Sequence, residues 1–196
     1  DVAIFFFFSI RHTAVIPIAG VEISCDIAMA LRASTNEAEA IKLTHGDSKQ
    51  SLVEKRTEFE VAGLGDRAQN RLLSKNTLAA VIEPRVEELF SLVSQVSRES
   101  GFDELISSGV VLTGGSSLLV GVVELAEDVF FRQVRVANPN YSGNLADVIS
   151  NPRYSTAMGL IIEANRDLSR FEPNVFDSNS WLEVLRKMKS WFVGNF

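Results

Sequence analysis

A pair of glycines between an apolar strand and a helix places the strongest limit on the fold of this chain. The run at 109–117 reads GVVLTGGSS, so we expect a buried strand followed by a tight loop at Gly114 and Gly115. A helix is expected next, over Leu118–Phe130, and then a second strand over Val134–Val136. Strand, loop, helix and strand in this order predict an α/β fold.

The first 20 residues predict a β-hairpin, with strands over Val2–Phe5 and Ile10–Ile18. The residues between them, Phe6, Phe7 and Phe8, are poor turn residues because tight hairpin turns need positive φ and favour Gly or Asn. The turn between the two strands is therefore unusual. Exposed phenylalanines at this place would also favour aggregation.

Apolar residues at helical spacing predict four further helices, and an alternating segment predicts a short strand. The helices are expected over Glu22–Arg32, Ser34–Thr44, Asn76–Arg98 and Arg153–Ala164, and the strand over Thr57–Val61. Ser34–Glu37 has the form of a capping box, in which the serine and the glutamate each satisfy a free backbone amide. Pro84 lies inside the longest helix and is expected to kink it.

Composition limits the possible functions. The 196 residues carry a net charge of -6, which argues against a nucleic-acid surface spread over the whole fold. No run approaches the roughly 20 apolar residues that span a bilayer. The single cysteine, Cys25, excludes an intrachain disulfide and suits a reducing compartment, and we expect it to be buried on a helix. The chain begins at Asp1 without a methionine, which suggests part of a longer protein.

Two groups of residues could bind a ligand. Gly114 and Gly115 leave no side chain in the way of a planar or anionic ligand at the carboxyl end of a strand, although a tight turn alone also explains them. Glu39 and Lys42 are three residues apart on one helix face. The carboxylate could accept from ribose hydroxyls and the ammonium could reach a base or a phosphate, although an ordinary surface pair is the alternative.

The end of the chain predicts an amphipathic helix over 179–196, after a polar linker at 167–178. Three basic residues stand there against one acidic residue, a net of +2. A basic, tryptophan-bearing helix after a linker favours an interfacial membrane anchor, and a helix docked on the protein's own core is the alternative. The residues expected to contact lipid are Trp181, Leu185, Arg186, Lys187, Met188, Lys189, Trp191 and Phe192.

Several segments resemble, in the same order, the bacterial cell-division family FtsA. They are IRHTAVIPIAG at 10–20, DIAMALR at 26–32, EAEAIK at 37–42, TLAAVIEPR at 77–85, VLTGGSS at 111–117, LADV at 145–148 and NPRYSTAMGL at 151–160. Each motif alone is weak, but the ordered set is specific and covers nearly the whole chain. The family usually has glycines where Phe7 and Phe8 stand, so the resemblance implies that the hairpin turn here is strained or rebuilt.

The resemblance implies an actin-like ATPase fold of the ribonuclease H-like type, of which this chain would be the second half with a C-terminal amphipathic helix. Residues 1–20 and 101–166 would form the inner subdomain and 21–100 the outer one. Glu39 and Lys42 would line the nucleoside of ATP, and Gly114, Gly115 and Ser116 the adenine side. Mg²⁺ and the phosphates would be held together with the missing first half.

The resemblance also implies a role. The protein would tether the FtsZ ring to the cytoplasmic face of the bacterial inner membrane at the division site, through its C-terminal helix and anionic lipid. It would bind the FtsZ tail near Asn76 and Arg85, self-associate into actin-like filaments and contact other division proteins, without nucleic acid. It would be a scaffold with at most weak ATPase activity in the full-length protein. The alternatives are half of an Hsp70-type chaperone or sugar kinase, which share the superfold, and an interaction domain without nucleotide.

Overall fold

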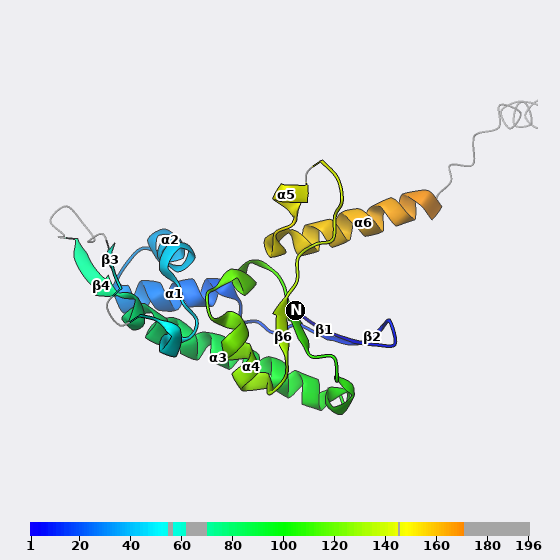
Figure 1. The fold of residues 1–196 in the computed structure, drawn as a ribbon, viewed down its shortest axis with the longest axis horizontal. Helices are drawn as coiled ribbons and strands as arrows, with labels where there is room; N and C mark the ends of the chain where they lie inside the picture. Colours follow the sequence, from blue (N-terminus) through cyan, green and yellow to red (C-terminus); the bar gives the residue numbers. More distant parts are fainter. Residues whose placement is uncertain (55–56, 62–69, 145, 171–196) are drawn as a thin grey trace, which may run out of the picture. The chain divides into compact units, whose positions relative to one another are not determined.

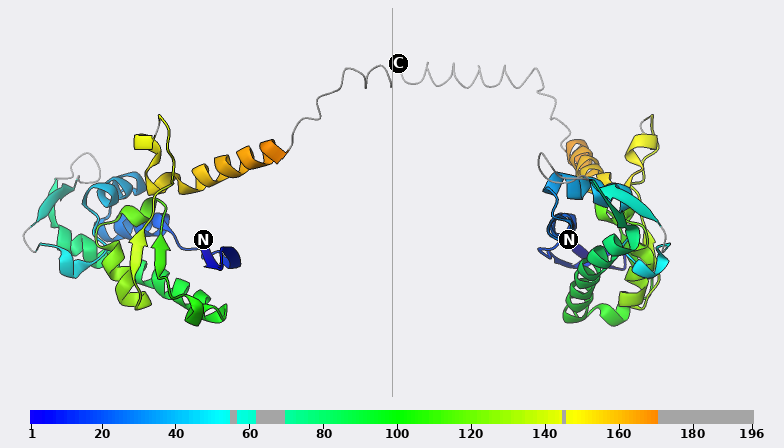
Figure 2. Two further views of the ribbon diagram at one scale, coloured as in Figure 1. Left: turned by 45° about the vertical axis from the view of Figure 1, so that its right-hand side comes forward. Right: turned by 90° about the vertical axis from the view of Figure 1, so that its left-hand side faces the viewer.

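The computed structural model describes residues 1–54, 57–61, 70–144 and 146–170, with side chains up to Arg166. The chain divides into two compact units, Asp1–Ser155 and Thr156–Phe196, hereafter unit 1 and unit 2. Figures 1 and 2 show the helices and strands. Among the described helices, none combines the length and the apolar character that a membrane crossing requires.

Unit 1 mixes strands and helices along the whole chain, in agreement with the predicted α/β class. Its elements in order are β1 (Val2–Phe6), β2 (Ser9–Ala14), α1 (Gly20–Leu31), α2 (Thr35–His45), η1 (Gln50–Leu52), β3 (Glu58–Val61), β4 (Arg71–Ser74), α3 (Lys75–Glu99), η2 (Asp103–Leu105), β5 (Val110–Leu112), η3 (Gly115–Leu118), α4 (Val122–Phe130), β6 (Val134–Val136), α5 (Ala146–Ile149) and η4 (Pro152–Tyr154). The described part of unit 2 is the helix α6, Ser155–Arg170, which starts at the boundary.

The described strands form three two-stranded sheets. β1 pairs with β2 and β3 with β4, both antiparallel, while β5 and β6 pair in parallel and are connected along the chain through α4. A parallel pair needs such a crossover, and the glycine loop at Gly114 lies directly after β5. The predicted strand–loop–helix–strand order is therefore confirmed, whereas β4 was not predicted.

The hairpin turn takes the strained form that the sequence predicts. Phe6 pairs with Ser9, so the loop contains only Phe7 and Phe8. These two residues have φ of 48° and 61°, a conformation that costs a residue with a side chain roughly 1–2 kcal/mol. The second strand ends at Ala14 rather than at Ile18.

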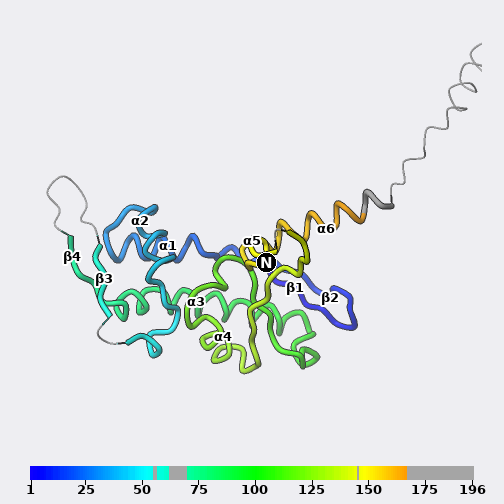
Figure 3. The backbone as a smooth tube through the Cα atoms, turned by 45° about the horizontal axis from the view of Figure 1, so that its top comes forward, coloured from blue at the N-terminus to red at the C-terminus, as the bar shows by residue number. Residues whose placement is uncertain are grey.

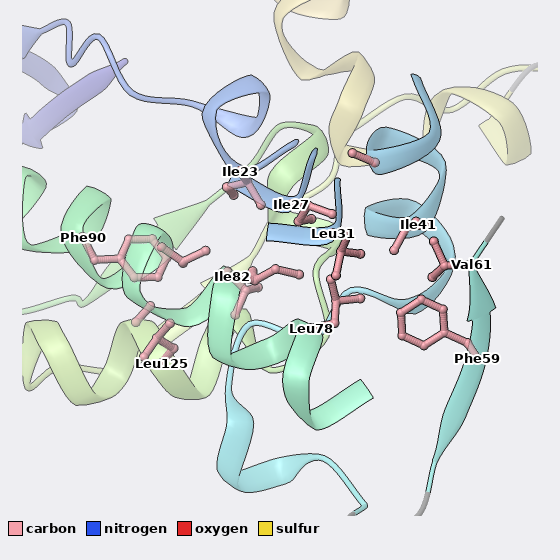
Figure 4. Packing of buried hydrophobic residues seen from close by; sticks show 14 of the residues in the cluster. Ile23, Ile27, Leu31, Ile41, Phe59, Val61, Leu78, Ile82, Phe90 and Leu125 are labelled. Atoms are coloured by element: carbon pink, nitrogen blue, oxygen red, sulfur yellow. The ribbon is translucent and has the colours of Figure 1, made fainter. Parts of the chain in front are cut away.

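The buried core of unit 1 lies among α1, α2, α3, α4 and the strand β3 (Figure 4). α3 contributes a stripe with the spacing i, i+4, i+8 and i+12, and helical periodicity alone accounts for its burial. Its members are Leu78, Ile82, Val86 and Phe90. Each such side chain contributes roughly 1.5–3 kcal/mol on burial. The core draws on both predicted subdomains, and the division at residues 20 and 100 stays a prediction.

Three expectations about local structure were wrong. The helix expected from Leu118 begins only at Val122, because Gly121 with φ of 77° breaks the chain after the 3₁₀ turn η3. Cys25 is exposed, because α1 turns Ile23, Ile27 and its other buried residues to the opposite side. α6 continues to Arg170, into the predicted linker.

Candidate nucleotide site

Local capping fixes where the two helices of the candidate site begin. The Glu22 carboxylate accepts a hydrogen bond from the Ala19 amide at 2.8 Å, so α1 starts at Gly20. The Ser34 hydroxyl accepts from the Glu37 amide at 3.3 Å, so α2 starts at Thr35 and the serine half of the predicted capping box is present. This start places Glu39 and Lys42 on the face of α2 that meets α1.

Lys42 links α2 to the first turn of α1. Its Nζ donates to the Gly20 carbonyl at 2.8 Å and to the Ser24 hydroxyl at 2.9 Å. It also donates to Glu39 Oε2 at 2.6 Å. An ammonium has three N–H groups, so these bonds use all of them. Ser24 additionally lies within hydrogen-bond distance of Glu39 Oε2 and of the Gly20 carbonyl.

Burial and charge give the members of this cluster different roles. Lys42 and Ser24 are buried, whereas the Glu39 side chain is 44% exposed. Desolvation raises the pKa of Glu39, but the hydrogen bonds from Lys42 and Ser24 outweigh it and leave the pKa below its ordinary value of 4.5. Glu39 is therefore an ionised acceptor with Oε2 held in place, while Lys42 positions it instead of reaching outward.

The glycine loop forms a second, open part of the site. Gly114 has φ of 91°, and its amide donates to the Pro152 carbonyl at 3.1 Å. Its carbonyl accepts from the amide and the hydroxyl of Ser117, at 3.2 and 2.7 Å. A Cβ atom on Gly114 or Gly115 would meet nothing within 4 Å. The turn explains why residue 114 is glycine, and the open space explains how a ligand could approach the loop.

Gly20 is the point where the two predicted groups meet. A Cβ atom on Gly20 would lie 2.7 Å from Ser116 Oγ and 3.5 Å from Lys42 Nζ. The loop of Ser116 and the cluster of Lys42 are thus neighbours, although they are about 74 positions apart in the chain. Sequence reasoning missed Gly20 and Ser24. Their spacing of four residues, which places them on one face of α1, was the signal available.

The structure does not bring Asn76 and Arg85 together. They are nine residues apart on α3, about two and a half turns, and so project from opposite sides of the helix. Asn76 exchanges hydrogen bonds with Gln50. Arg85 binds Asp26 through two nitrogens, at 2.6 and 3.0 Å, and Glu88 through a third at 2.7 Å.

A shallow hollow adjoins Asn76 but not Arg85. It is lined by Gln50, Ser51, Val53, Asn76 and Glu83. The backbone amide of Gln50 donates a hydrogen bond to Glu83 Oε2 at 2.9 Å, which links η1 to α3 at the hollow. The hollow is the part of the predicted partner face that could receive an extended peptide.

Two further expectations concern residues and ions that this geometry does not test. The eight residues expected to contact lipid lie outside the described residues, as does the predicted helix 179–196. Within the described ranges, no three His, Cys, Asp or Glu side chains are grouped so as to hold a metal ion.

Comparison with protein families gives one match to most of the chain. The family model described as cell division protein FtsA matches residues 1–159. Among curated relatives, cell division protein FtsA of Pseudomonas aeruginosa is 43% identical over 202 residues, which cover 100% of this chain and 48% of the relative. The FtsA protein of Escherichia coli is 40% identical over 208 residues, covering 100% of the chain and 49% of the relative. The chain thus spans about half the length of these relatives.

Solved structures share the fold at low sequence identity. MreB5 of Spiroplasma citri bound to ADP superposes with a TM-score of 0.64 at 16% identity, over 85% of this chain and 50% of that one. The same protein bound to AMPPNP gives a TM-score of 0.61 at 16% identity, over 82% and 47%. These neighbours are actin-like, which confirms the predicted fold class.

Proposed function

Since the chain belongs to the FtsA family of cell-division proteins, we propose that it binds ATP and tethers the FtsZ ring to the cytoplasmic face of the inner membrane at the division site. The observation that carries the nucleotide part is the convergence at Gly20, where the Glu39–Lys42 cluster meets the loop of Ser116. The membrane part rests on the sequence of residues 179–196.

The residues at Gly20 suit the nucleoside of ATP. Only Oε2 of Glu39 is engaged within the described structure, so Oε1 is an ionised acceptor for ribose hydroxyls. The open backbone at Gly114 and Gly115 would accept the flat face of a base. Mg²⁺ and the phosphates of ATP would be held together with the part of the relatives that this sequence does not cover. The role proposed for Lys42 is to hold Glu39.

Photolabelling can test this assignment even if the isolated chain binds weakly, as we expect without the other wall of the cleft. We expect 8-azido-ATP to label the chain and unlabelled ATP to compete. Glu39→Gln should reduce labelling, because a neutral amide is a weaker acceptor for hydroxyls. Glu37→Gln, two positions away on α2, is the matched control and should not. Equal labelling of both variants would argue against a site at Glu39.

The tether itself can be tested by sedimentation with vesicles. We expect the chain to pellet with liposomes, increasingly so as anionic lipid replaces neutral lipid, because Arg186, Lys187 and Lys189 would each gain about 1 kcal/mol near such a surface. A chain ending at Asn174 should stay in solution. If both stay in solution, the C-terminal segment is not the anchor, and an actin-like half from another class of ATPase becomes the better assignment.

We propose the hollow beside Asn76 as the place where the FtsZ tail binds, with Arg85 outside the contact. The Asn76 and Gln50 side chains bond each other with part of their amide groups and keep further donor and acceptor capacity for an extended peptide backbone, whereas Arg85 is engaged by two carboxylates. Asn76→Ala should weaken binding of an FtsZ-tail peptide, and Arg85→Ala should affect stability more than binding.

The chain is proposed to act as a scaffold that self-associates into filaments, not as an enzyme. Filaments would multiply weak membrane contacts by avidity.

A further inference from the structure

The β1–β2 hairpin ends in a cluster of exposed apolar side chains. Phe5, Phe7, Phe8 and Ile10 are all exposed, with Phe7 at 77% and Phe8 fully so. Among the residues of the two strands and their turn, only Ile4 is buried. The hairpin lies at the edge of unit 1 in the ribbon and tube views (Figures 1 and 3). Exposed apolar side chains grouped on one hairpin are typical of a contact site.

Two residues of the hairpin turn adopt a strained backbone conformation. Phe7 and Phe8 both have positive φ, which glycine or asparagine adopts with less strain. Ile4 pairs with His12 and Phe5 pairs with Ile10, so Arg11 is the extra residue of a β-bulge. Strained residues and bulges gather at functional positions. Neither phenylalanine at the turn belongs to the core, and although the Phe7 ring lies 4.4 Å from the Phe6 ring, most of the surface of both turn residues is open to a contact outside the hairpin.

Charge and shape favour a lipid surface as the occupant. Arg11 is the only charged residue between Val2 and Ile18, in a chain whose net charge is -6. Arg11 is exposed and forms no ion pair with any residue that the structure describes. The tip is a two-residue protrusion, which a bilayer interface can take up without a preformed pocket. An apolar tip beside a free cation matches acyl chains beneath anionic headgroups.

We propose that Phe7 and Phe8 insert into the interfacial layer of a membrane containing anionic lipid, with Arg11 beside the lipid phosphates. This contact would be additional to the C-terminal helix. It rests on the proposed membrane tether, because that helix would bring the chain to the bilayer. Two weak contacts on one chain strengthen attachment by raising each other's effective concentration.

A single tryptophan at the tip can report insertion directly. The only tryptophans of the chain are Trp181 and Trp191, so Trp181→Phe and Trp191→Phe give a background without tryptophan that keeps aromatic residues in the C-terminal segment. Phe8→Trp then places one fluorophore at the tip. With vesicles of equal parts phosphatidylcholine and phosphatidylglycerol, brominated on the acyl chains, we expect a blue shift of the emission and a loss of emission intensity. The matched control is Leu72→Trp on β4, an exposed apolar position outside the hairpin, which should not be quenched.

Sedimentation and quenching together distinguish insertion of the hairpin tip from anchoring by the C-terminal segment. Pelleting without quenching of the tip tryptophan would overturn the insertion and leave the C-terminal tether in place. No pelleting of the parent chain with its two tryptophans, together with no quenching of the tip tryptophan, would overturn both. A blue shift that grows with protein concentration in the absence of vesicles would show that a second copy covers the tip, and would also overturn the proposal.

A double substitution at the turn measures how much the tip contributes to membrane affinity, without a fluorophore. Phe7→Asn together with Phe8→Gly keeps residues that suit the turn and removes the apolar tip. We expect this variant to bind the same unbrominated vesicles about tenfold more weakly, because burying an aromatic side chain contributes at least that much. Leu72→Thr should bind as the parent does. Unchanged binding by the double variant would contradict the insertion.

Discussion

Replacing Lys42 by methionine tests the role of the cluster at Gly20. Lys42 is 9% exposed in its side chain, and its ammonium makes three hydrogen bonds to α1 and α2. Methionine keeps much of the volume of the stem and removes the charge. The substitution should therefore disconnect Glu39 from α1 without opening a large cavity.

The expected loss is about 2 kcal/mol in the free energy of unfolding. Removing one partner of a fully buried ion pair costs roughly 3–5 kcal/mol because the other charge is left unpaired. Glu39 is 44% exposed and can recover water, which reduces that cost. The hydrogen bonds to Gly20 and Ser24 are lost in any case, at roughly 0.5–1.5 kcal/mol net for each bond. For a chain of this size the urea midpoint should fall by about 1 M.

Urea unfolding followed by circular dichroism at pH 7 measures this loss, with Lys49→Met as the matched control. Lys49 also makes an ion pair at 2.6 Å, but its partner Asp128 is 61% exposed, so the control should lose less than about 1 kcal/mol. Adding Glu39→Gln to Lys42→Met should restore part of the stability, because no unpaired carboxylate remains. Equal losses for the two lysine variants would refute the cluster as a structural link.

The same variants have an expected dependence on pH. The folded pKa of Glu39 lies below its ordinary 4.5, so the unfolded chain binds more protons and stability rises with pH through this range. The contribution is present above the unfolded pKa and is lost as pH falls through the folded pKa. The stability difference between the parent and Lys42→Met should therefore narrow below pH 4.5. A difference independent of pH would mean that Glu39 is not held by Lys42.

Three further predictions follow from backbone and charge. Gly109→Ala should lower the free energy of unfolding by at least about 3 kcal/mol, because φ is 86° and the added Cβ would lie 2.4 Å from the Gln133 carbonyl oxygen. Gly101→Ala has a similar φ of 75° but open space around the added Cβ, so it should cost about 1 kcal/mol. Urea unfolding midpoints measure both losses. Hydrogen bonds from Arg132 and Ser97 hold the pKa of Asp103 below 3.8, so the parent should lose stability as pH falls through that range and Asp103→Asn should lack this component in thermal melts. Phe7→Asn with Phe8→Gly should raise the free energy of unfolding by about 2 kcal/mol, and a lower urea midpoint would contradict the strained turn.

Local patterns predicted the elements that carry their own signals. The helix α3, the Ser34 cap of α2 and the glycine loop after β5 all appear where the sequence places them, because spacing, capping and turn chemistry act over a few residues. The strand β4 was missed because the four residues of Arg71–Ser74 acquire their β structure by pairing with β3, which the local sequence does not encode. Cys25 was wrongly predicted to be buried, because that prediction rested on the usual burial of cysteine and not on the position of residue 25 on the helix. The spacing of the buried Ile23 and Ile27 already put Cys25 on the exposed side.

The sequence also predicted the candidate site only in part. Spacing correctly put Glu39 and Lys42 on one face of a helix, but the sequence could not say which of them faces a ligand. That division depends on Gly20 and Ser24, which together with Oε2 of Glu39 occupy the three N–H groups of Lys42, while the other oxygen of Glu39 has no partner in the described structure. A buried ammonium with three acceptors is satisfied, whereas a half-exposed carboxylate with a free oxygen can still bind. The tertiary contact with α1 therefore makes Glu39 the residue by which ligand binding at this site should be judged.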